Sequence, residues 1–483
     1  MESPDKTAVD AEIRSMMPFE HRWHNRFHFE MPFGKLGSPC GLTVSRGIYH
    51  LFFRWNPSDC NAGETCWGHV MTRDFLRYSY PQLALWPSDA FDADGCLSGC
   101  GFADNSHVRV LYSGICVKDG QIVPSLRTGT LQGDGTIAKD PPFLTGSPEG
   151  YTGHFRDPYL FHRHSQTYFT VGAQSDDGHA SALVYEKTPN GWENRGALET
   201  RLGRFGHMWE SPNLLRFGSY DALLFCPQGL DPREFDRQNL YQSGYIAGHA
   251  SLDAMAMLQH SKFQELDHGF DFYAPQVFQH EGRHILIGWM GMPDRDDEYP
   301  TREKGWMHTL TLPRVLTLRQ GHIYAQPLRE LRALRIQETA LDIDADMTKS
   351  LHTELFDGSE VLLDIVFGKA QKVTLELVYG LEKIVLSYDR KLQIMRIDRN
   401  GMQNGGRGVR QFRLFADRVL SLQLFIDQTA VEAFFQHGEE TATFYAFPAK
   451  HIRPELRLSA DAAMETVSGR VWELDHFRYL DCI

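Results

Sequence analysis

The sequence predicts an all-β protein, and two observations lead to this class. Short apolar or alternating runs recur along most of the chain, for example IYHLFFRW from Ile48 and RHILIGWM from Arg283. Gly, Asp, Asn and Pro stand between these runs, as turn residues stand between strands. Few segments have the apolar spacing of a helix. At 483 residues, the chain is long enough for two or three domains with a large core.

The pattern of runs divides the chain into an arm and two β domains. Residues 1–24 form an N-terminal arm, in which residues 9–17 combine helix formers with apolar spacing. Residues 25–340 contain many short strands, and this amount of β structure suits a propeller better than one sandwich, since radial blades limit exposed strand edges. Blade repeats are not visible in the sequence itself.

The third section, residues 341–483, has tighter β patterns, such as VLLDIVF, KVTLELVY and LSLQLFID. Strands of this length joined by hairpin-like turns predict a β-sandwich of ordinary domain size. The join between the domains, roughly residues 327–344, contains the short helical pattern PLRELRALR rather than a flexible linker. We therefore expect the two domains to pack rigidly against each other.

Charge and composition exclude several classes of function. The net charge of −13 and the lack of a basic run argue against a nucleic-acid partner, which needs clustered Lys and Arg. No apolar run approaches the ~18–20 residues that span a bilayer, and no signal segment is visible, so we expect a soluble cytoplasmic protein. The eight cysteines form no CxxC pair. Free structural thiols are favoured over a metal site or disulfides.

Several motifs stand in a fixed order along the chain. They are FHFEMPFGKLGSPCG at residues 27–41, CWGH at 66–69, GCLSG at 95–99, HFRDP at 154–158, WESP at 209–212 and LDHGFDFYAPQ at 266–276. Together they resemble glycoside hydrolase family 32, the invertases and sucrose-6-phosphate hydrolases, over about residues 25–480. The stretch 427–448 resembles the C-terminal signature of that family. The resemblance implies a five-bladed β-propeller followed by a C-terminal β-sandwich.

Glycoside cleavage of this kind uses two carboxylates on opposite faces of the scissile bond, and the acid needs a raised pKa to stay protonated near neutral pH. By the resemblance, Glu210 is the general acid/base and Asp157 binds sugar hydroxyls and stabilises the oxocarbenium-like charge. Arg156 orients the carboxylates and Ser98 contacts sugar. The alternative for Glu210 is a surface glutamate before a proline, and for the Arg156–Asp157 pair a structural ion pair.

Two further residues, Asp271 and Trp289, are expected at the rim of the pocket by the same resemblance. For Asp271, an ordinary turn residue is nearly as good an interpretation. Acid/base cleavage of a glycoside requires neither a metal nor a cofactor, so none is expected. The predicted partner is a small carbohydrate, and the sequence gives no indication of oligomeric state.

The departures from the family pattern gather on the first blade. Ser38 stands where the family has its nucleophilic Asp, Lys35 where it has Trp, and Gly37 where it has Asn. In the same blade Arg54 replaces a sugar-binding Gln and Ala62 a pocket Trp, and Glu64 replaces an Asn. Several pocket positions that change together, within a retained scaffold, indicate a pocket rebuilt for another ligand.

A serine hydroxyl is a poor nucleophile without a base. Ser38 could instead leave room for a water that Glu64 activates, which would favour an inverting route. Arg54 could bind an anionic group of the substrate, such as phosphate or carboxylate, or form an ion pair with Glu64.

Two functions therefore compete. The first is a glycoside hydrolase that acts on a fructoside or a related, non-standard glycoside, including anionic ones. The alternative is a catalytically inactive carbohydrate-binding pseudoenzyme, because loss of a nucleophile usually costs many orders of magnitude in rate. An engineered or trapped hydrolase is a weaker alternative, since a knock-out would change one residue.

Overall fold

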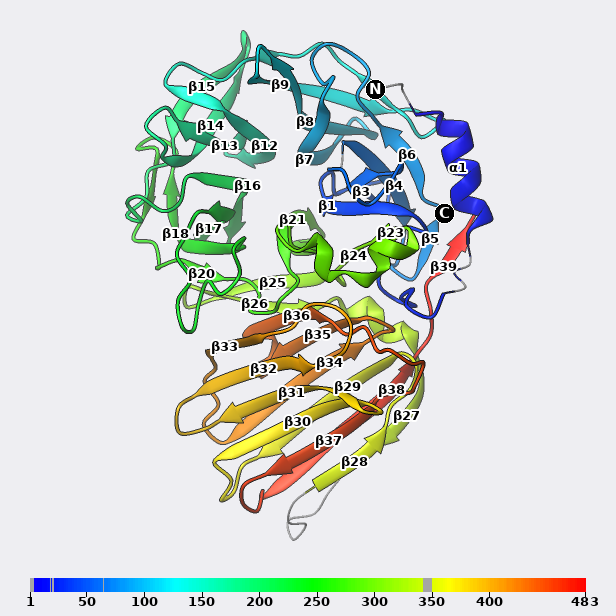
Figure 1. Ribbon diagram of the computed structural model, residues 1–483. Coiled ribbons are helices and arrows are strands. Elements are labelled where there is room, and N and C mark those ends of the chain that lie inside the picture. Colours follow the sequence, from blue (N-terminus) through cyan, green and yellow to red (C-terminus); the bar gives the residue numbers. More distant parts are fainter. Residues whose placement is uncertain (1–3, 18, 20, 64, 342–349) are drawn as a thin grey trace.

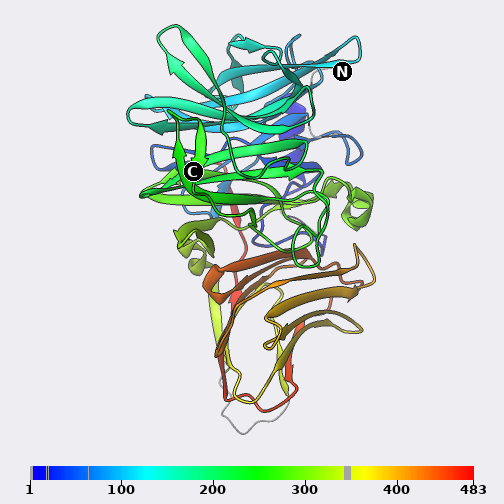
Figure 2. The ribbon, with the colours of Figure 1, turned by 90° about the vertical axis from the view of Figure 1, so that its left-hand side faces the viewer.

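The computed structural model describes residues 4–17, 19, 21–63, 65–341 and 350–483. It has the predicted all-β class: a five-bladed β-propeller followed by a C-terminal β-sandwich. Figure 1 looks along the propeller axis, with the sandwich below the ring of blades, and Figure 2 shows the same two bodies from the side. None of the helices in the described residues is long and apolar enough to cross a membrane.

The first blade combines strands from both ends of the propeller and from the C-terminus of the chain. Its sheet is built from β1 (Gly34–Pro39), β2 (Thr43–Ser45), β3 (Ile48–Asn56), β4 (Cys66–Thr72), β5 (Arg77–Ser79), β6 (Gln82–Leu85), β23 (Trp306–Met307) and β39 (Arg478–Leu480). Strand β23 pairs in parallel with β1, which closes the ring of blades. Strand β39 pairs with β5, so the last residues of the chain return to the propeller (Figure 1).

Four more sheets complete the ring. They consist of β7 (Gly95–Asp104), β8 (His107–Lys118), β9 (Gln121–Leu131), β10 (Ile137–Lys139) and β11 (Leu144–Thr145); β12 (Tyr151–Arg163), β13 (Gln166–Ser175), β14 (Ala180–Thr188) and β15 (Gly191–Ala197); β16 (Met208–Phe217), β17 (Tyr220–Gln228), β18 (Gly244–Ser251), β19 (Ala256–Leu258) and β20 (Gln264–Glu265); and β21 (Tyr273–His280), β22 (Arg283–Met290), β24 (Thr309–Leu310), β25 (Arg314–Arg319) and β26 (His322–Pro327). Short 3₁₀ helices, η1 (Asp296–Glu298) and η2 (Pro300–Lys304), interrupt the fifth blade.

The sandwich contains two antiparallel sheets whose apolar faces enclose one core. One sheet has β27 (Arg335–Ala340), β29 (Ser359–Val366), β34 (Val419–Ile426), β35 (Ala430–Phe435), β36 (Glu440–Tyr445) and β38 (Thr466–Leu474); the other has β28 (Ser350–Glu354), β30 (Lys372–Tyr379), β31 (Glu382–Asp389), β32 (Ile394–Gly401), β33 (Val409–Arg413) and β37 (Glu455–Ala460). Burial alternates along β31, as expected for a strand with one face on the core. The 3₁₀ helix η4 (Gln436–Gly438) joins β35 to β36.

The expected domain boundary at residue 340 is one strand too late. Strand β27 pairs with β38 of the sandwich, from Arg335 opposite Leu474 to Ala340 opposite Arg470. The 3₁₀ helix η3 (Arg329–Leu334) occupies the helical pattern seen in the sequence and lies just before β27. The partner of β27 lies far along the chain, so local pattern alone could not assign this strand to the sandwich.

The N-terminal arm lies against the first blade. Its helix α1 (Lys6–Ser15) begins at Asp5, whose side chain accepts hydrogen bonds from the amides of the first turn. Asp10 of the helix accepts a hydrogen bond from the Leu83 amide of β6 at 2.8 Å, and Ile13 is fully buried. The arm is therefore part of the propeller packing (Figure 1).

The innermost strand of every blade contains a β-bulge at a corresponding place. The register slips by one residue in β1, β7, β12, β16 and β21, between Leu36 and Pro39, Cys96 and Gly99, Arg156 and Tyr159, Glu210 and Asn213, and Tyr273 and Gln276. A bulge re-aims side chains and bends the strand locally. These five bulges place polar residues of distant segments around one axis.

A buried charge network joins the two domains. Arg314 of β25 donates to Glu432 of the sandwich, at 3.0 Å from Nε and 2.5 Å from Nη2, and to Asp267 at 3.0 Å. His28 lies between Glu432, at 3.1 Å, and Asp427, at 2.9 Å. Burial alone would lower the pKa of His28, but its two carboxylate partners raise the pKa to about 9. Every member of the network therefore has an opposite charge as its partner.

Asp271 belongs to this domain interface and not to the rim of the pocket, so that expectation was wrong. Its side chain is fully buried. It accepts hydrogen bonds from the Tyr299 hydroxyl at 2.9 Å, from Arg399 at 2.8 Å and from the Tyr445 amide at 3.0 Å. Arg399 and Tyr445 come from the sandwich. The carboxylate thus binds the fifth blade to the second domain.

The network predicts that domain docking depends strongly on Arg314. The substitution Arg314→Met leaves Glu432 and Asp267 buried with one partner fewer, and breaking a buried ion pair in this way costs about 3–5 kcal/mol. We expect a large fall in the denaturation midpoint. Arg418→Gln is the control, because it removes an exposed pair with Glu465, worth ~0–1 kcal/mol. Equal midpoints for the two variants would contradict the role given to Arg314.

Candidate active site

A cavity of 420 Å³ lies where the five innermost strands converge. Each of these strands contributes to its lining: Lys35 and Ser38 from β1, Leu97 and Ser98 from β7, Gly153 to Asp157 from β12, Glu210 and Ser211 from β16, and Tyr273 and Ala274 from β21. The bulges lie at or next to these positions. The cavity is thus a product of the propeller architecture and not of one loop.

Three of the lining residues hold a strained backbone. Asp157, Ser211 and Ala274 have φ values of 64°, 49° and 44°, and each precedes a proline. A residue other than glycine in this left-handed region costs about 1–3 kcal/mol, and such residues concentrate at functional sites. Here the conformation is fixed from both sides of Asp157, because its amide donates to Ser113 Oγ at 3.1 Å and its carboxylate accepts from the Ser211 amide at 3.1 Å.

Glu210 is held by a cation and a hydroxyl. Arg156 donates to its Oε1 from Nε at 2.9 Å and from Nη2 at 2.7 Å, and the Tyr273 hydroxyl donates to its Oε2. Burial alone would raise the pKa of Glu210, but Arg156 and Tyr273 together hold the pKa below its ordinary value. The chemistry of a glycosidic acid predicted a raised pKa, so the pKa of Glu210 differs from that expectation.

Asp157 shows the opposite behaviour. Burial and the neighbouring charge of Glu210 raise its pKa to about 6, against a smaller opposing effect of Arg156. Two carboxyl groups with pKa values pushed apart are the usual signature of an acid/base pair. Asp157 therefore takes up a proton as the pH falls through about 6, whereas Glu210 stays ionised over that range.

The first two blades supply hydroxyls and cations to the same cavity. Ser38 Oγ lies 3.2 Å from Ser98 Oγ, so its hydrogen-bond partner is a second hydroxyl rather than a carboxylate or an imidazole. Lys35 lies behind these residues and donates to Asp296 of η1 at 2.6 Å. Arg54 lines the cavity from β3. A third cation, Arg156, lies among the lining residues as well.

The structure brings most of the residues named from the sequence together. Those that line the cavity are Ser38, Arg54, Ser98, Arg156, Asp157, Glu210 and Trp289. Asp271 lies at the domain interface, and Glu64 lies outside the described residues. Ala62, which was expected at a pocket position, is exposed in a bend between β3 and β4. The roles of the seven lining residues stay predictions.

Sequence reasoning missed two contributors of different kinds. Tyr273 contacts Glu210 directly, although the FYAPQ motif was noticed without a role for its tyrosine. Its position beside Trp289, the pairing residue on β22, is visible only in the folded sheet. Tyr241 enters the cavity from an irregular loop that carries no motif, so no local signal could have found it.

Comparison with protein-family models gives one result for nearly the whole chain. The model described as glycosyl hydrolases family 32 N-terminal domain matches residues 28–327. The model described as glycosyl hydrolases family 32 C terminal matches residues 328–473. The border between the two matches falls at the end of β26, before β27, where the structure also changes from propeller to sandwich.

Curated relatives and solved structures agree with these matches. The chain is 33% identical over 466 residues to a sucrose-6-phosphate hydrolase of Bacillus subtilis (strain 168), with 94% of each chain covered. It is 31% identical to a raffinose invertase of Escherichia coli, covering 94% of this chain and 95% of that protein.

Among solved structures, the sucrose-6-phosphate hydrolase from Lactobacillus gasseri superposes with a TM-score of 0.86 at 26% identity, covering 98% of this chain and 97% of that one. The β-fructofuranosidase BmSUC1 of Bombyx mori gives a TM-score of 0.84 at 25% identity, with 98% and 99% covered.

Because the pKa of Asp157 is raised, the variant Asp157→Asn should be more stable than the wild type at high pH and equally stable at low pH. A carboxyl whose pKa is higher in the folded protein binds its proton more tightly there, so stability falls as the pH rises from about 4 through about 6. The variant, which has no carboxyl to ionise, should melt at a higher temperature than the wild type at pH 8. At pH 4 the two should melt alike. A variant that melts lower at pH 8 would contradict the assigned pKa.

Proposed function

The chain belongs to glycosyl hydrolase family 32, whose members cleave O-glycosyl bonds, and we propose that its own substrate is a fructoside or a related glycoside that carries an anionic group. The names of the relatives support a sugar of this kind, since they are sucrose-6-phosphate hydrolases and an invertase. The cavity of 420 Å³ is of a size that holds a small molecule.

The balance of charge in the cavity supports the anionic group. Lys35, Arg54 and Arg156 line it beside the two carboxyl groups of Asp157 and Glu210. Arg side chains recognise phosphate and carboxylate with paired hydrogen bonds, and they do so best where water is partly excluded.

An anionic substrate would also restore the proton of Glu210. In a retaining site of this family, the nucleophilic carboxylate lies ~5–5.5 Å from the acid and its charge raises the pKa of the acid. Ser38 provides no such charge, so Arg156 dominates and Glu210 is ionised. An anionic group bound near Arg54 or Arg156 replaces the missing negative charge, and Glu210 then gains the proton that it passes to the leaving oxygen.

Water is the nucleophile in this proposal. Ser38 and Ser98 form a pair of hydroxyls that can hold a water molecule at the sugar face where the family has its Asp. Because water attacks directly, no sugar–enzyme ester forms and the configuration at the anomeric carbon inverts. The base proposed on sequence grounds is Glu64, which lies outside the described residues. Asp157 binds the sugar hydroxyls and stabilises the positive charge of the transition state.

One observation favours a second function: the hydrogen-bond partner of Ser38 is a hydroxyl and not a base that would activate it. A site with no nucleophile and an ionised Glu210 could bind a carbohydrate without cleaving it. The protein would then be a catalytically inactive carbohydrate-binding pseudoenzyme. Retention of the full Arg156, Asp157, Glu210 and Tyr273 arrangement supports the hydrolase, because binding alone needs no strained acid/base pair.

Product release from sucrose, sucrose-6-phosphate and short fructans distinguishes these functions. We expect the phosphorylated sugar to be hydrolysed with the highest kcat/KM. Glu210→Gln should lower kcat by about 10²–10⁴, the usual contribution of a general acid/base. Arg54→Gln should lower kcat/KM for sucrose-6-phosphate by about 10- to 100-fold, the worth of hydrogen bonds to a charged group, and should leave sucrose hydrolysis nearly unchanged.

The control for Glu210→Gln is Glu465→Gln, which makes the same chemical change at a half-exposed residue of the sandwich. Preference for neutral sucrose, or an equal effect of Arg54→Gln on both sugars, would contradict the anionic substrate. Saturable binding with no turnover of any sugar would replace the hydrolase by the binding protein. The variant Glu64→Gln then tests whether Glu64 is the base that activates water. An unchanged kcat would exclude Glu64 from that role.

A further inference from the structure

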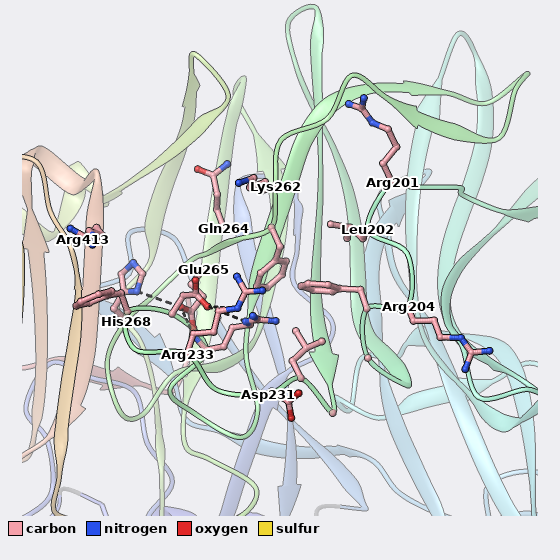
Figure 3. Close-up of a pocket in the computed structure, with 18 of the residues that line it drawn as sticks. Arg201, Leu202, Arg204, Asp231, Arg233, Lys262, Gln264, Glu265, His268 and Arg413 are labelled. Carbon is pink, nitrogen blue, oxygen red and sulfur yellow. Dashed lines mark hydrogen bonds and ion pairs between the residues drawn. The ribbon is translucent and has the colours of Figure 1, made fainter.

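A second cavity, of 930 Å³, lies outside the catalytic one, between the fourth blade and the sandwich. Figure 3 shows its lining, which comes from the loops around residues 201–206, 229–237 and 262–268 and from Arg413 at the end of β33. It is separate from the catalytic cavity, since the two share no lining residue. None of the functions discussed above uses it.

The lining of this second cavity carries a surplus of positive charge. Six Arg and Lys side chains line it against four Asp and Glu. His268 lies between Glu440, at 2.8 Å, and Glu265, at 3.6 Å. Burial alone would lower the pKa of His268, but the two carboxylates raise it to about 10. Seven positive groups therefore line the cavity with four carboxylates, on a chain whose net charge is −13.

Three of the four carboxylates of the lining already pair with basic residues of the same lining. Glu265 and Glu440 share His268, and Asp236 pairs with Arg237 at 3.0 Å. Arg233 reaches Asp236 only at 4.0 Å. Three of the four carboxylates thus lie around His268 and Arg237, and the fourth, Asp231, lies apart from them (Figure 3).

Three further cations have neutral contacts. Arg413 donates to the Leu392 carbonyl at 3.2 Å and lies over the ring of Phe235, and Arg201 donates to the His260 carbonyl at 3.4 Å. Lys262 is exposed beside them. None of the three forms an ion pair with the described carboxylates. In Figure 3, Arg413 lies at the left of the view, Lys262 at the upper centre and Arg201 at the upper right.

Aromatic rings form the other part of the lining. Phe205 and Phe263 pack together with ring centroids 5.0 Å apart, and both are partly exposed. Phe235 presents a third partly exposed ring beneath Arg413. Apolar and aromatic walls with a few charged groups are typical of small-molecule sites. A ligand that fits has an apolar face for the rings and a compact dianion for the guanidinium groups.

We propose that this cavity is a binding site for a phosphorylated carbohydrate, distinct from the catalytic cavity. The C–H face of the sugar lies against Phe205 and Phe263, and the phosphate lies among Arg233, Lys262 and Arg413. A phosphate monoester carries nearly two negative charges at neutral pH, which matches the surplus of the lining. An arginine guanidinium donates two parallel hydrogen bonds to two phosphate oxygens, and this gives the site its preference for phosphate over a monovalent anion.

The site adjoins the strand that carries Glu210. The Phe205 carbonyl accepts a hydrogen bond from Trp209 Nε1 at 2.6 Å, and Trp209 directly precedes Glu210. Gly229 lines the second cavity and its neighbour Gln228 lines the catalytic one. Because the two sites share this wall, an experiment has to separate binding at one from binding at the other.

Calorimetric titration with fructose 6-phosphate tests the proposal, because this probe has no glycosidic bond to cleave. The variant that removes the site is Lys262→Gln/Arg413→Gln, in which both residues are exposed, and melting temperature verifies its fold. We expect its affinity at one site to fall at least tenfold. Arg418→Gln, a matched exposed arginine of the sandwich, should bind as the wild type does. Arg54→Gln should still bind fructose 6-phosphate at the second cavity.

Three results would overturn the proposal. Unchanged affinity in the double variant would show that the phosphate binds elsewhere. Complete loss of binding in Arg54→Gln would assign all binding to the catalytic cavity. Inorganic phosphate that binds as tightly as fructose 6-phosphate would show an anion site without a role for the sugar. Failure of the proposed hydrolase function leaves this test unaffected, since no turnover is measured.

Discussion

The bulge in each innermost strand is the constraint on which the catalytic cavity depends. A flat strand would direct alternate side chains up and down the blade, whereas a bulge turns one residue toward the propeller axis. Five such bulges bring together Ser38, Ser98, Asp157, Glu210 and Tyr273 from segments spread over nearly half of the chain. The strained backbone of Asp157 is held by hydrogen bonds to the Ser113 hydroxyl and from the Ser211 amide.

Within that frame, the charged partners of Glu210 and Asp157 explain the electrostatics of the site. Glu210 is bound by Arg156 and Tyr273, and without a charged neighbour at position 38 its pKa is lowered. Burial and the neighbouring charge of Glu210 raise the pKa of Asp157 to about 6. Arg156 and Tyr273 therefore keep Glu210 ionised, while burial and Glu210 favour the protonated form of Asp157. Under the proposed function, an anionic substrate would reverse this balance and return the proton to Glu210.

The sequence was informative where local pattern decides structure. Alternating runs and turn residues predicted the all-β class, and ordered motifs predicted which side chains would meet, including Arg156, Asp157 and Glu210. Contacts between distant segments were not accessible in this way. Strand β27 was assigned to the wrong domain because its partner β38 lies over 100 residues later.

Asp271 was assigned to the pocket for the same reason. A motif identifies an important carboxylate, but only the fold shows that its partners are Arg399 and Tyr445 of the sandwich. The direction of the Glu210 pKa also depends on tertiary contacts. It follows from the guanidinium of a residue 54 positions away, held beside it by the packing of β12 on β16.

The anomeric configuration of the first product tests the central claim most directly. Sucrose-6-phosphate, or whichever glycoside the protein cleaves fastest, is hydrolysed in an NMR tube and the sugar is observed before it mutarotates. With Ser38 in place of a carboxylate and water as the nucleophile, the product should appear with inverted configuration. Retained configuration would require a covalent intermediate, and would contradict the account of the first blade.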